Sequence, residues 1–207
     1  TGNPEFTFFK SVYKRHTNFA IDYQFVNFVG DANNAFGKKL YLDIPKNGDL
    51  LHKSHLVIDI SGFTGLKEIT PAAYSLIEYI DLFIGGQRLD RLYGSWLQAW
   101  HELYEDKDVV LGKMISSQPL SNSSTSNKLY IPLRFWFNRN PGLALPLIAL
   151  QYHEVKINVE IENITKLIKT DVVDLTTVED ASSTASSGSG LSEASITSAS
   201  LYVDYIY

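Results

Sequence analysis

Histidine side chains are the residues of this sequence best suited to bind a metal or to transfer protons. There are five, at His16, His52, His55, His101 and His153. His52 and His55 are three positions apart, so on a strand they point to opposite faces. No His-Glu-x-x-His pattern of a zinc hydrolase occurs, and the His-x-His cluster that a cupin-type jelly-roll enzyme needs is also missing. We therefore interpret the histidines as structural residues and expect no metal site.

Motifs for phosphate binding and nucleophilic catalysis are missing as well. Gly85-Gly86-Gln87-Arg88 resembles part of a phosphate-binding loop but lacks the Lys and Ser or Thr that hold phosphate and magnesium, so we interpret it as a tight β-turn. The sequence has no cysteine and no Gly-x-Ser-x-Gly elbow. Glu78, Asp81 and Asp90 do not have a recognisable paired-carboxylate spacing. We expect no catalytic residue and no cofactor, and therefore no enzyme.

Two tripeptides match the acceptor rule for N-linked glycosylation, at Asn122 and Asn163. The tripeptide is frequent by chance and no signal peptide is recognisable, so both are minor candidates for sugar attachment. The chain begins at Thr1 without a methionine and ends at Tyr207 inside an apolar run. This suggests a processed or partial chain.

Alternation of apolar and polar residues predicts that strands carry most of these side chains. Predicted strands cover residues 19–29, 36–44, 56–60, 78–84, 129–137, 153–161 and 201–207, with further short strands at 3–13 and 109–115. In the first strand, one face holds Phe19, Ile21, Tyr23, Phe25 and Val29. Ser95 is a suitable N-cap for a helix over residues 95–104, and a shorter turn is expected over 71–76.

Many strands, few helices and no βαβ alternation predict an all-β fold. We expect an antiparallel, eight-stranded jelly-roll sandwich with one or two short helices in its loops, formed by residues 1–207 as a single domain. Residues 1–18 are expected to form an N-terminal arm, and the Ser-rich, low-complexity residues 176–195 an exposed loop. The net charge of −5 argues against direct binding of nucleic acid.

Residues 140–157 form the most unusual apolar segment. Prolines and a glycine prevent its first half from being one continuous strand, whereas its second half alternates strictly. A segment too irregular for a strand and too short for a membrane span must be covered by protein, either by the core of the chain or by a neighbouring subunit. The candidate residues for an assembly contact or a core plug are Pro141, Leu143, Leu145, Pro146 and Leu147.

Four blocks of the sequence, at residues 1–20, 84–90, 140–157 and 202–207, resemble the major capsid proteins of nucleocytoplasmic large DNA viruses. They appear in the order found in that family and are spread over the whole chain. The resemblance implies two consecutive jelly rolls per subunit, of which this chain would be the N-terminal one and would lack the second. The Ser-rich residues 176–195 lie outside the matching blocks.

The resemblance further implies a structural protein of the virion. Three copies would form a pseudo-hexagonal capsomer, and these homotrimers would tile an icosahedral shell. The partners would be neighbouring capsomers and minor capsid proteins, close to an internal viral membrane, with assembly in the host cytoplasm.

Other proteins could share such a fold, because fold alone does not determine function. A carbohydrate- or receptor-binding jelly roll would carry a shallow aromatic and polar site on its loops, and a jelly-roll enzyme would need a metal. A single-jelly-roll minor capsid or penton component is the nearest alternative.

Overall fold

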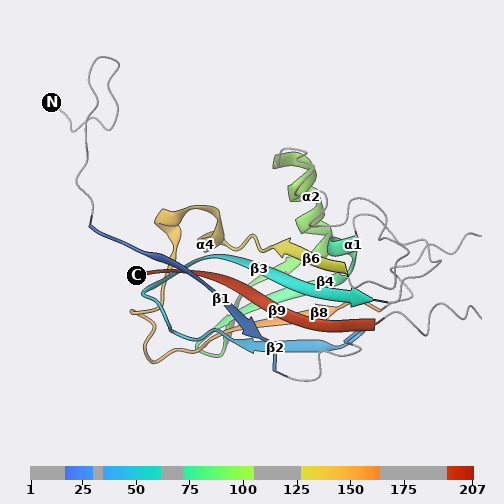
Figure 1. The fold of residues 1–207 in the computed structure, drawn as a ribbon, viewed down its shortest axis with the longest axis horizontal. Helices are drawn as coiled ribbons and strands as arrows, with labels where there is room; N and C mark the ends of the chain where they lie inside the picture. The colour runs from blue at the N-terminus through green and yellow to red at the C-terminus, as the bar shows by residue number, and fades with distance from the viewer. Residues whose placement is uncertain (1–16, 30–34, 62–71, 105–126, 164–194) are drawn as a thin grey trace, which may run out of the picture.

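The computed structural model describes residues 17–29, 35–61, 72–104, 127–163 and 195–207, which fold into two antiparallel β-sheets packed face to face (Figure 1). The first sheet contains, in spatial order, β1 (Ile21–Asn27), β9 (Ser195–Ile206), β3 (Leu50–Ser61) and β6 (Asn127–Pro132). The short β7 (Leu145–Pro146) also pairs with β3. The second sheet contains, in spatial order, β2 (Lys39–Asp43), β8 (Val155–Ile161), β4 (Ile77–Ile84) and β5 (Gln87–Tyr93).

Strands from distant parts of the chain lie side by side in both sheets, as β1 does beside β9 and β2 beside β8. This alternation of early and late strands is the order of a jelly roll, and it confirms the all-β, eight-stranded prediction, to which β7 is a two-residue addition. The inward faces of the two sheets form one core. Its fully buried members include Leu56, Ile58 and Leu201 from the first sheet, and Ile80 and Ile157 from the second.

The strand β3 is longer than the sequence predicts, because it starts at Leu50 rather than at residue 56. Its pairing with β9 shifts register between Leu51 and Ser54. A bulge adds a residue to one strand and so breaks the period-2 pattern by which the strand was recognised. The side chains of His52 and Ser54 are buried beside the irregularity.

The strand β6 is shorter than predicted, since it ends at Pro132 and a helical turn, α4 (Trp136–Arg139), replaces the expected strand end. Phe135 and Phe137 are nevertheless fully buried, with stacked rings whose centroids are 5.7 Å apart. The alternation up to Phe137 therefore agrees with the burial of these side chains, but the prediction that the strand continues to residue 137 was wrong.

The turn predicted at Gly85-Gly86 joins β4 to β5, and both glycines have positive φ, at 60° and 83°. Positive φ at both central residues is typical of the type I′ hairpin turn, which glycine adopts without steric cost. The following strand, β5, was not predicted, because it is a polar edge strand with Leu92 as its one buried side chain.

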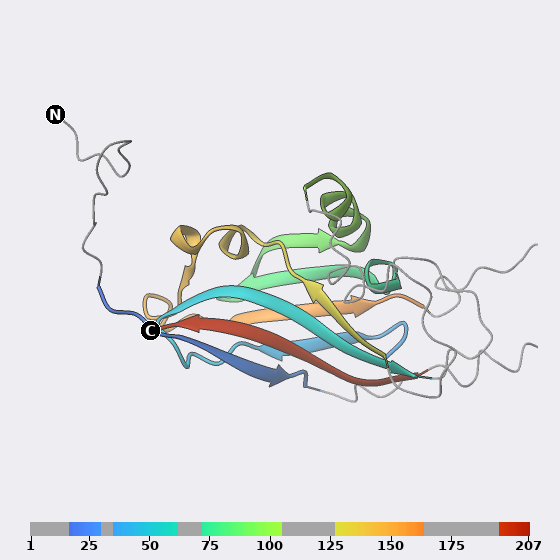
Figure 2. The same ribbon diagram turned by 45° about the horizontal axis from the view of Figure 1, so that its top comes forward.

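The longest described helix, α2 (Gly94–Tyr104), begins one residue before the predicted N-cap Ser95. It packs next to α1 (Ala72–Ser75), which occupies the predicted turn, and contacts β4 and β5 (Figure 2). A side chain at Gly94 would collide with the carbonyl oxygens of Tyr74 and Ile77, so glycine permits this close approach. None of the described helices has the length and apolar character needed to cross a bilayer.

Several predicted features lie outside the described residues. They are residues 1–16 of the N-terminal arm, the short strands at 3–13 and 109–115, most of the Ser-rich loop at 176–195, and Asn122.

Candidate assembly surface

A buried hydrogen-bond network fixes the start of the candidate segment to the first sheet. The Asn138 amide donates to the His52 carbonyl at 2.6 Å and to Ser54 Oγ at 2.9 Å, and its Oδ1 accepts from the Phe135 amide at 3.2 Å. His52 Nδ1 lies 3.0 Å from the Phe137 carbonyl oxygen. The helical turn α4 is thereby attached to the bulge of β3.

The segment that follows changes conformation every few residues. The 3-10 helix η1 (Pro141–Leu143) is capped by Asn140, whose Oδ1 accepts from the Gly142 amide at 2.9 Å. The strand β7 then pairs with Leu50 and Leu51 at the start of β3. The Asn140 cap, the 3-10 helix and the short β7 pairing supply hydrogen bonds to the backbone of this apolar segment. It therefore does not need to form one continuous strand.

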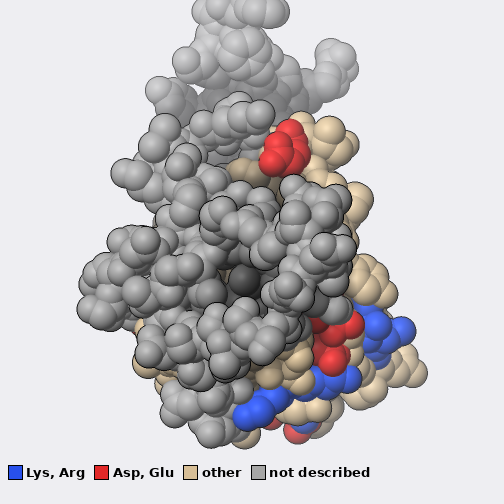
Figure 3. Space-filling view, turned by 90° about the vertical axis from the view of Figure 1, so that its right-hand side faces the viewer, with Lys and Arg blue, Asp and Glu red and all other residues tan. Residues whose placement is uncertain are grey.

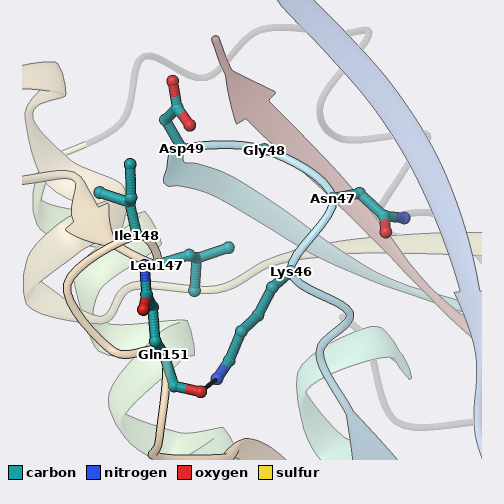
Figure 4. A pocket seen from close by; sticks show the side chains of 7 residues that line it. All are labelled: Lys46, Asn47, Gly48, Asp49, Leu147, Ile148 and Gln151. Atoms are coloured by element: carbon teal, nitrogen blue, oxygen red, sulfur yellow. Dashed lines mark hydrogen bonds between the residues drawn. The ribbon is translucent and has the colours of Figure 1, made fainter.

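The turn after β7 is held by the loop before β3 (Figure 4). The amides of Leu147 and Ile148 donate to the Asp49 carbonyl at 2.9 and 3.3 Å. Lys46 Nζ donates to the carbonyls of Leu150 and Gln151 at 2.6 and 2.8 Å. Sequence reasoning missed Lys46, and the sequence contains no signal for it, because its partners lie more than 100 positions away.

The structure divides the five candidate residues into two groups. Leu145 and Leu147 are buried in the hydrophobic core, whereas Pro141, Leu143 and Pro146 are exposed. Two further apolar side chains of the same segment, Ile148 and Tyr152, are more than half exposed. One side of the segment therefore completes the core, and the other presents apolar surface to the outside.

A pocket of about 220 Å³ lies beside this segment, between Lys46–Asp49 and Leu147, Ile148 and Gln151 (Figure 4). This is smaller than the roughly 300–1,000 Å³ of typical small-molecule sites. Its one cationic side chain, Lys46, already binds two carbonyl oxygens. The pocket is a gap between two loops and has no group arranged for a ligand.

His16 lies outside the described residues, and the described histidines are not brought together as a group. His52 belongs to the α4 network, His153 is exposed just before β8, and the ring of His55 packs against Tyr202 with centroids 6.0 Å apart. Burial, aided by Arg134 and Lys53, lowers the pKa of His55 and so favours its neutral form. Within the described part of the chain, no three His, Asp or Glu side chains are grouped to hold a metal.

Two of the three carboxylates considered for catalysis, Asp81 and Asp90, have structural partners, and the third, Glu78, is exposed. Asp81 is buried, and its two carboxylate oxygens accept from Arg91 Nε at 2.6 Å and from Arg91 Nη2 at 2.7 Å. These bonds raise the pKa of Arg91, whose guanidinium also stacks on the Tyr79 ring at 3.8 Å. Asn163, a possible sugar acceptor, is exposed just after β8.

Comparison with known proteins places this geometry in a family. The family model for the major capsid protein N-terminus matches residues 7–207. The chain belongs to the major capsid protein N-terminus family. The major capsid protein of Pyramimonas orientalis virus is 42% identical over 216 aligned residues, which cover 100% of this chain and 49% of that protein.

Solved structures agree with this membership. A crystal structure of PBCV-1 VP54, fitted into a reconstruction of the virophage Sputnik, has a TM-score of 0.74 and 31% identity, covering 97% of this chain and 45% of that chain. A quasi-atomic model of the PBCV-1 virus capsid gives a TM-score of 0.73 at 33% identity, with the same coverage. This member of the capsid family spans about half the length of the relatives that it matches.

Proposed function

We propose that this chain is the N-terminal jelly roll of the major capsid protein of a large icosahedral DNA virus and acts as a structural protein of the virion shell. The observation that carries the proposal is the family match over residues 7–207 together with a jelly roll that superimposes on VP54 along nearly the whole chain. The role is structural, and we assign no catalytic step to it.

The subunit that we propose contains two consecutive jelly rolls, of which residues 1–207 are the first. Three subunits form a pseudo-hexagonal capsomer, which contacts neighbouring capsomers and minor capsid proteins above an internal membrane after assembly in the host cytoplasm. The matched relatives, about twice as long as this chain, support the second jelly roll of this subunit. The exposed side of residues 140–152 supplies apolar contact area for such a neighbour.

The experiment is to express two forms, the 207-residue chain and the protein that continues past Tyr207, and to measure their mass by light scattering. We expect trimers with a pseudo-hexagonal outline in electron micrographs from the longer form, and monomers from the 207-residue form. A longer form that is monomeric, or that forms five-fold rings, would contradict the proposal and favour a penton or minor component.

A further inference from the structure

The edge strand β1 turns its apolar face away from the core. On this face lie Phe19, just before the strand, and Ile21, Tyr23 and Phe25 within it, with exposed fractions between 48% and 62%. The polar side chain of Gln24 points the other way and donates to Asp22 at 3.3 Å, while it accepts from Asn47 at 2.5 Å. The alternation predicted from the sequence is present, but its hydrophobic side faces outward.

The neighbouring strand β9 extends this apolar face. In the register of the sheet, Phe25 lies opposite Tyr202 and Tyr23 opposite Asp204. The Tyr202 ring stacks on Tyr23 with centroids 5.5 Å apart and meets Phe25 edge-on at 4.8 Å. We call Phe19, Ile21, Tyr23, Phe25 and Tyr202 the β1 aromatic surface. The rings of Tyr23, Phe25 and Tyr202 are held together by mutual contact, so the centre of the surface is ordered before any partner arrives.

Polar atoms next to the β1 aromatic surface lack partners. In the described structure, Asp204 Oδ1 and His55 Nδ1 are buried without a hydrogen-bond partner, and both residues flank Tyr202 on the same face. Buried polar groups are normally paired. Asn158 Oδ1, on the outer face of the second sheet, is unpaired in the same way, so these atoms do not by themselves identify the contact surface.

The outer face of the second sheet has a different chemistry. Lys39 lies 3.2 Å from Glu160, Lys156 lies 3.4 Å from Asp43, and Arg91 binds Asp81. Figure 3 shows acidic and basic side chains next to one another along one flank of the molecule. This face also exposes Tyr41 and Tyr93, but they stand on its two edge strands, with β8 and β4 between them. On the first sheet, by contrast, the rings of Tyr23, Phe25 and Tyr202 touch one another, and contiguous exposed apolar side chains of this kind mark a contact surface.

The position of Tyr207 indicates what covers the β1 aromatic surface. The Tyr207 amide donates to the Ala20 carbonyl at 2.9 Å, and the Ala20 amide donates to the Tyr207 carbonyl at 3.2 Å. Figures 1 and 2 accordingly show the C-terminal end beside the start of β1. Chain that continues past Tyr207 therefore emerges at the margin of the surface, next to Phe19 and Ile21.

We propose that the β1 aromatic surface is the docking site for the β-domain that follows Tyr207 in the same polypeptide. This rests on the proposed function, in which a second jelly roll follows the first. The family match to an N-terminal region, and the coverage of 49% of the Pyramimonas orientalis virus protein, leave room for a domain of similar size. A short connection raises the effective concentration of that domain at the adjacent surface, so the first docking event is intramolecular.

The test compares two tyrosines with matched exposure on edge strands of different sheets, Tyr23 of β1 at 55% and Tyr41 of β2 at 52%. The chain has no cysteine, so Tyr23→Cys and Tyr41→Cys each introduce a single thiol into the 207-residue form. Maleimide labelling is followed by mass spectrometry of the peptide that carries the new cysteine. In the 207-residue form we expect similar labelling rates. In the longer protein we expect at least tenfold slower labelling at position 23, with position 41 within about twofold.

Equal labelling of the two positions in the longer protein, whether fast or slow, would overturn the inference. The inference would also be overturned if position 23 of the 207-residue form became more protected from labelling as the protein concentration rises. The surface would then be covered by a second copy of the chain. Hydroxyl-radical footprinting of Tyr23 and Tyr41 in the unmodified protein repeats the comparison without substitution. Trimers with an unprotected position 23 would refute this inference alone, whereas protection without trimers would refute the capsomer proposal alone.

Discussion

At the scale of single residues, Asp204 is the clearest case of a side chain that the isolated jelly roll does not fully accommodate. It lies in β9 beside the β1 aromatic surface, and its Oδ1 has no hydrogen-bond partner among the described residues. Burial raises the pKa of its carboxyl above the ordinary value of 3.8, although Lys53 and His52 oppose the shift. The folded chain therefore favours the protonated carboxyl more than the unfolded chain does. The contribution of the protonated Asp204 carboxyl to folding stability is present when the pH is below the ordinary pKa. It is lost as the pH rises through the raised pKa of the folded chain.

We therefore expect Asp204→Asn to raise the Tm of the 207-residue form at neutral pH and to reduce the fall in Tm as the pH rises from about 4. Thermal unfolding followed by circular dichroism across this pH range measures both effects. Asp49→Asn, at an exposed carboxylate in the loop before β3, serves as the control and should leave the Tm nearly unchanged. A lower Tm for Asp204→Asn at neutral pH would show that the charge is stabilised by the fold.

At the scale of elements, the link between α4 and β3 shows how far the sequence predicts local structure. Alternation identified Phe135 and Phe137 as inward-facing, and both are buried. It did not reveal that the chain bends there, because the cause is a set of hydrogen bonds from Asn138 to residues more than 80 positions earlier. The bulge of β3 was hidden for the same reason, since local periodicity is lost where tertiary partners impose an irregularity.

Asn138→Ala is expected to lower the free energy of unfolding by about 2–3 kcal/mol, because it leaves the buried His52 carbonyl, Ser54 hydroxyl and Phe135 amide without partners. Urea unfolding measures the loss. The matched control is Asn140→Ala, which removes only an exposed cap at Gly142 and should cost about 1 kcal/mol or less. Equal losses from the two variants would mean that α4 does not depend on the buried network.

At the scale of the whole molecule, residues 140–152 contribute both to the core and to the outer surface. Sequence analysis left open whether this segment covers its own core or meets a neighbour. The structure places Leu147 in the core with 1% exposure and the adjacent Ile148 at 58%. The two side chains are neighbours of similar size. Substitution of Leu147 therefore tests the role of the segment in the core, and substitution of Ile148 tests its role on the surface.

Leu147→Ala should destabilise the 207-residue form by about 2–4 kcal/mol through loss of buried contacts and an added cavity. Ile148→Asp should change its stability by less than about 0.5 kcal/mol, because the side chain is exposed. In the longer protein, however, we expect Ile148→Asp to reduce the trimer fraction by placing a charge in an apolar contact. Urea unfolding and light scattering measure the two effects, and unaltered trimers from Ile148→Asp would remove this segment from the subunit contact.

The sequence by itself determined the fold class, the main strands and the Gly85-Gly86 turn, because alternation, helical spacing and glycine preference act over a few neighbouring residues. Tertiary structure decided which face of each strand is covered. Alternation divides β1 into an aromatic and a polar face, but only its register with β9 turns Tyr23 and Phe25 outward. The same holds for Leu147 and Ile148, whose opposite environments arise from pairing with the distant loop at Asp49. Burial is a property of contacts between distant segments, and local sequence patterns do not specify those contacts.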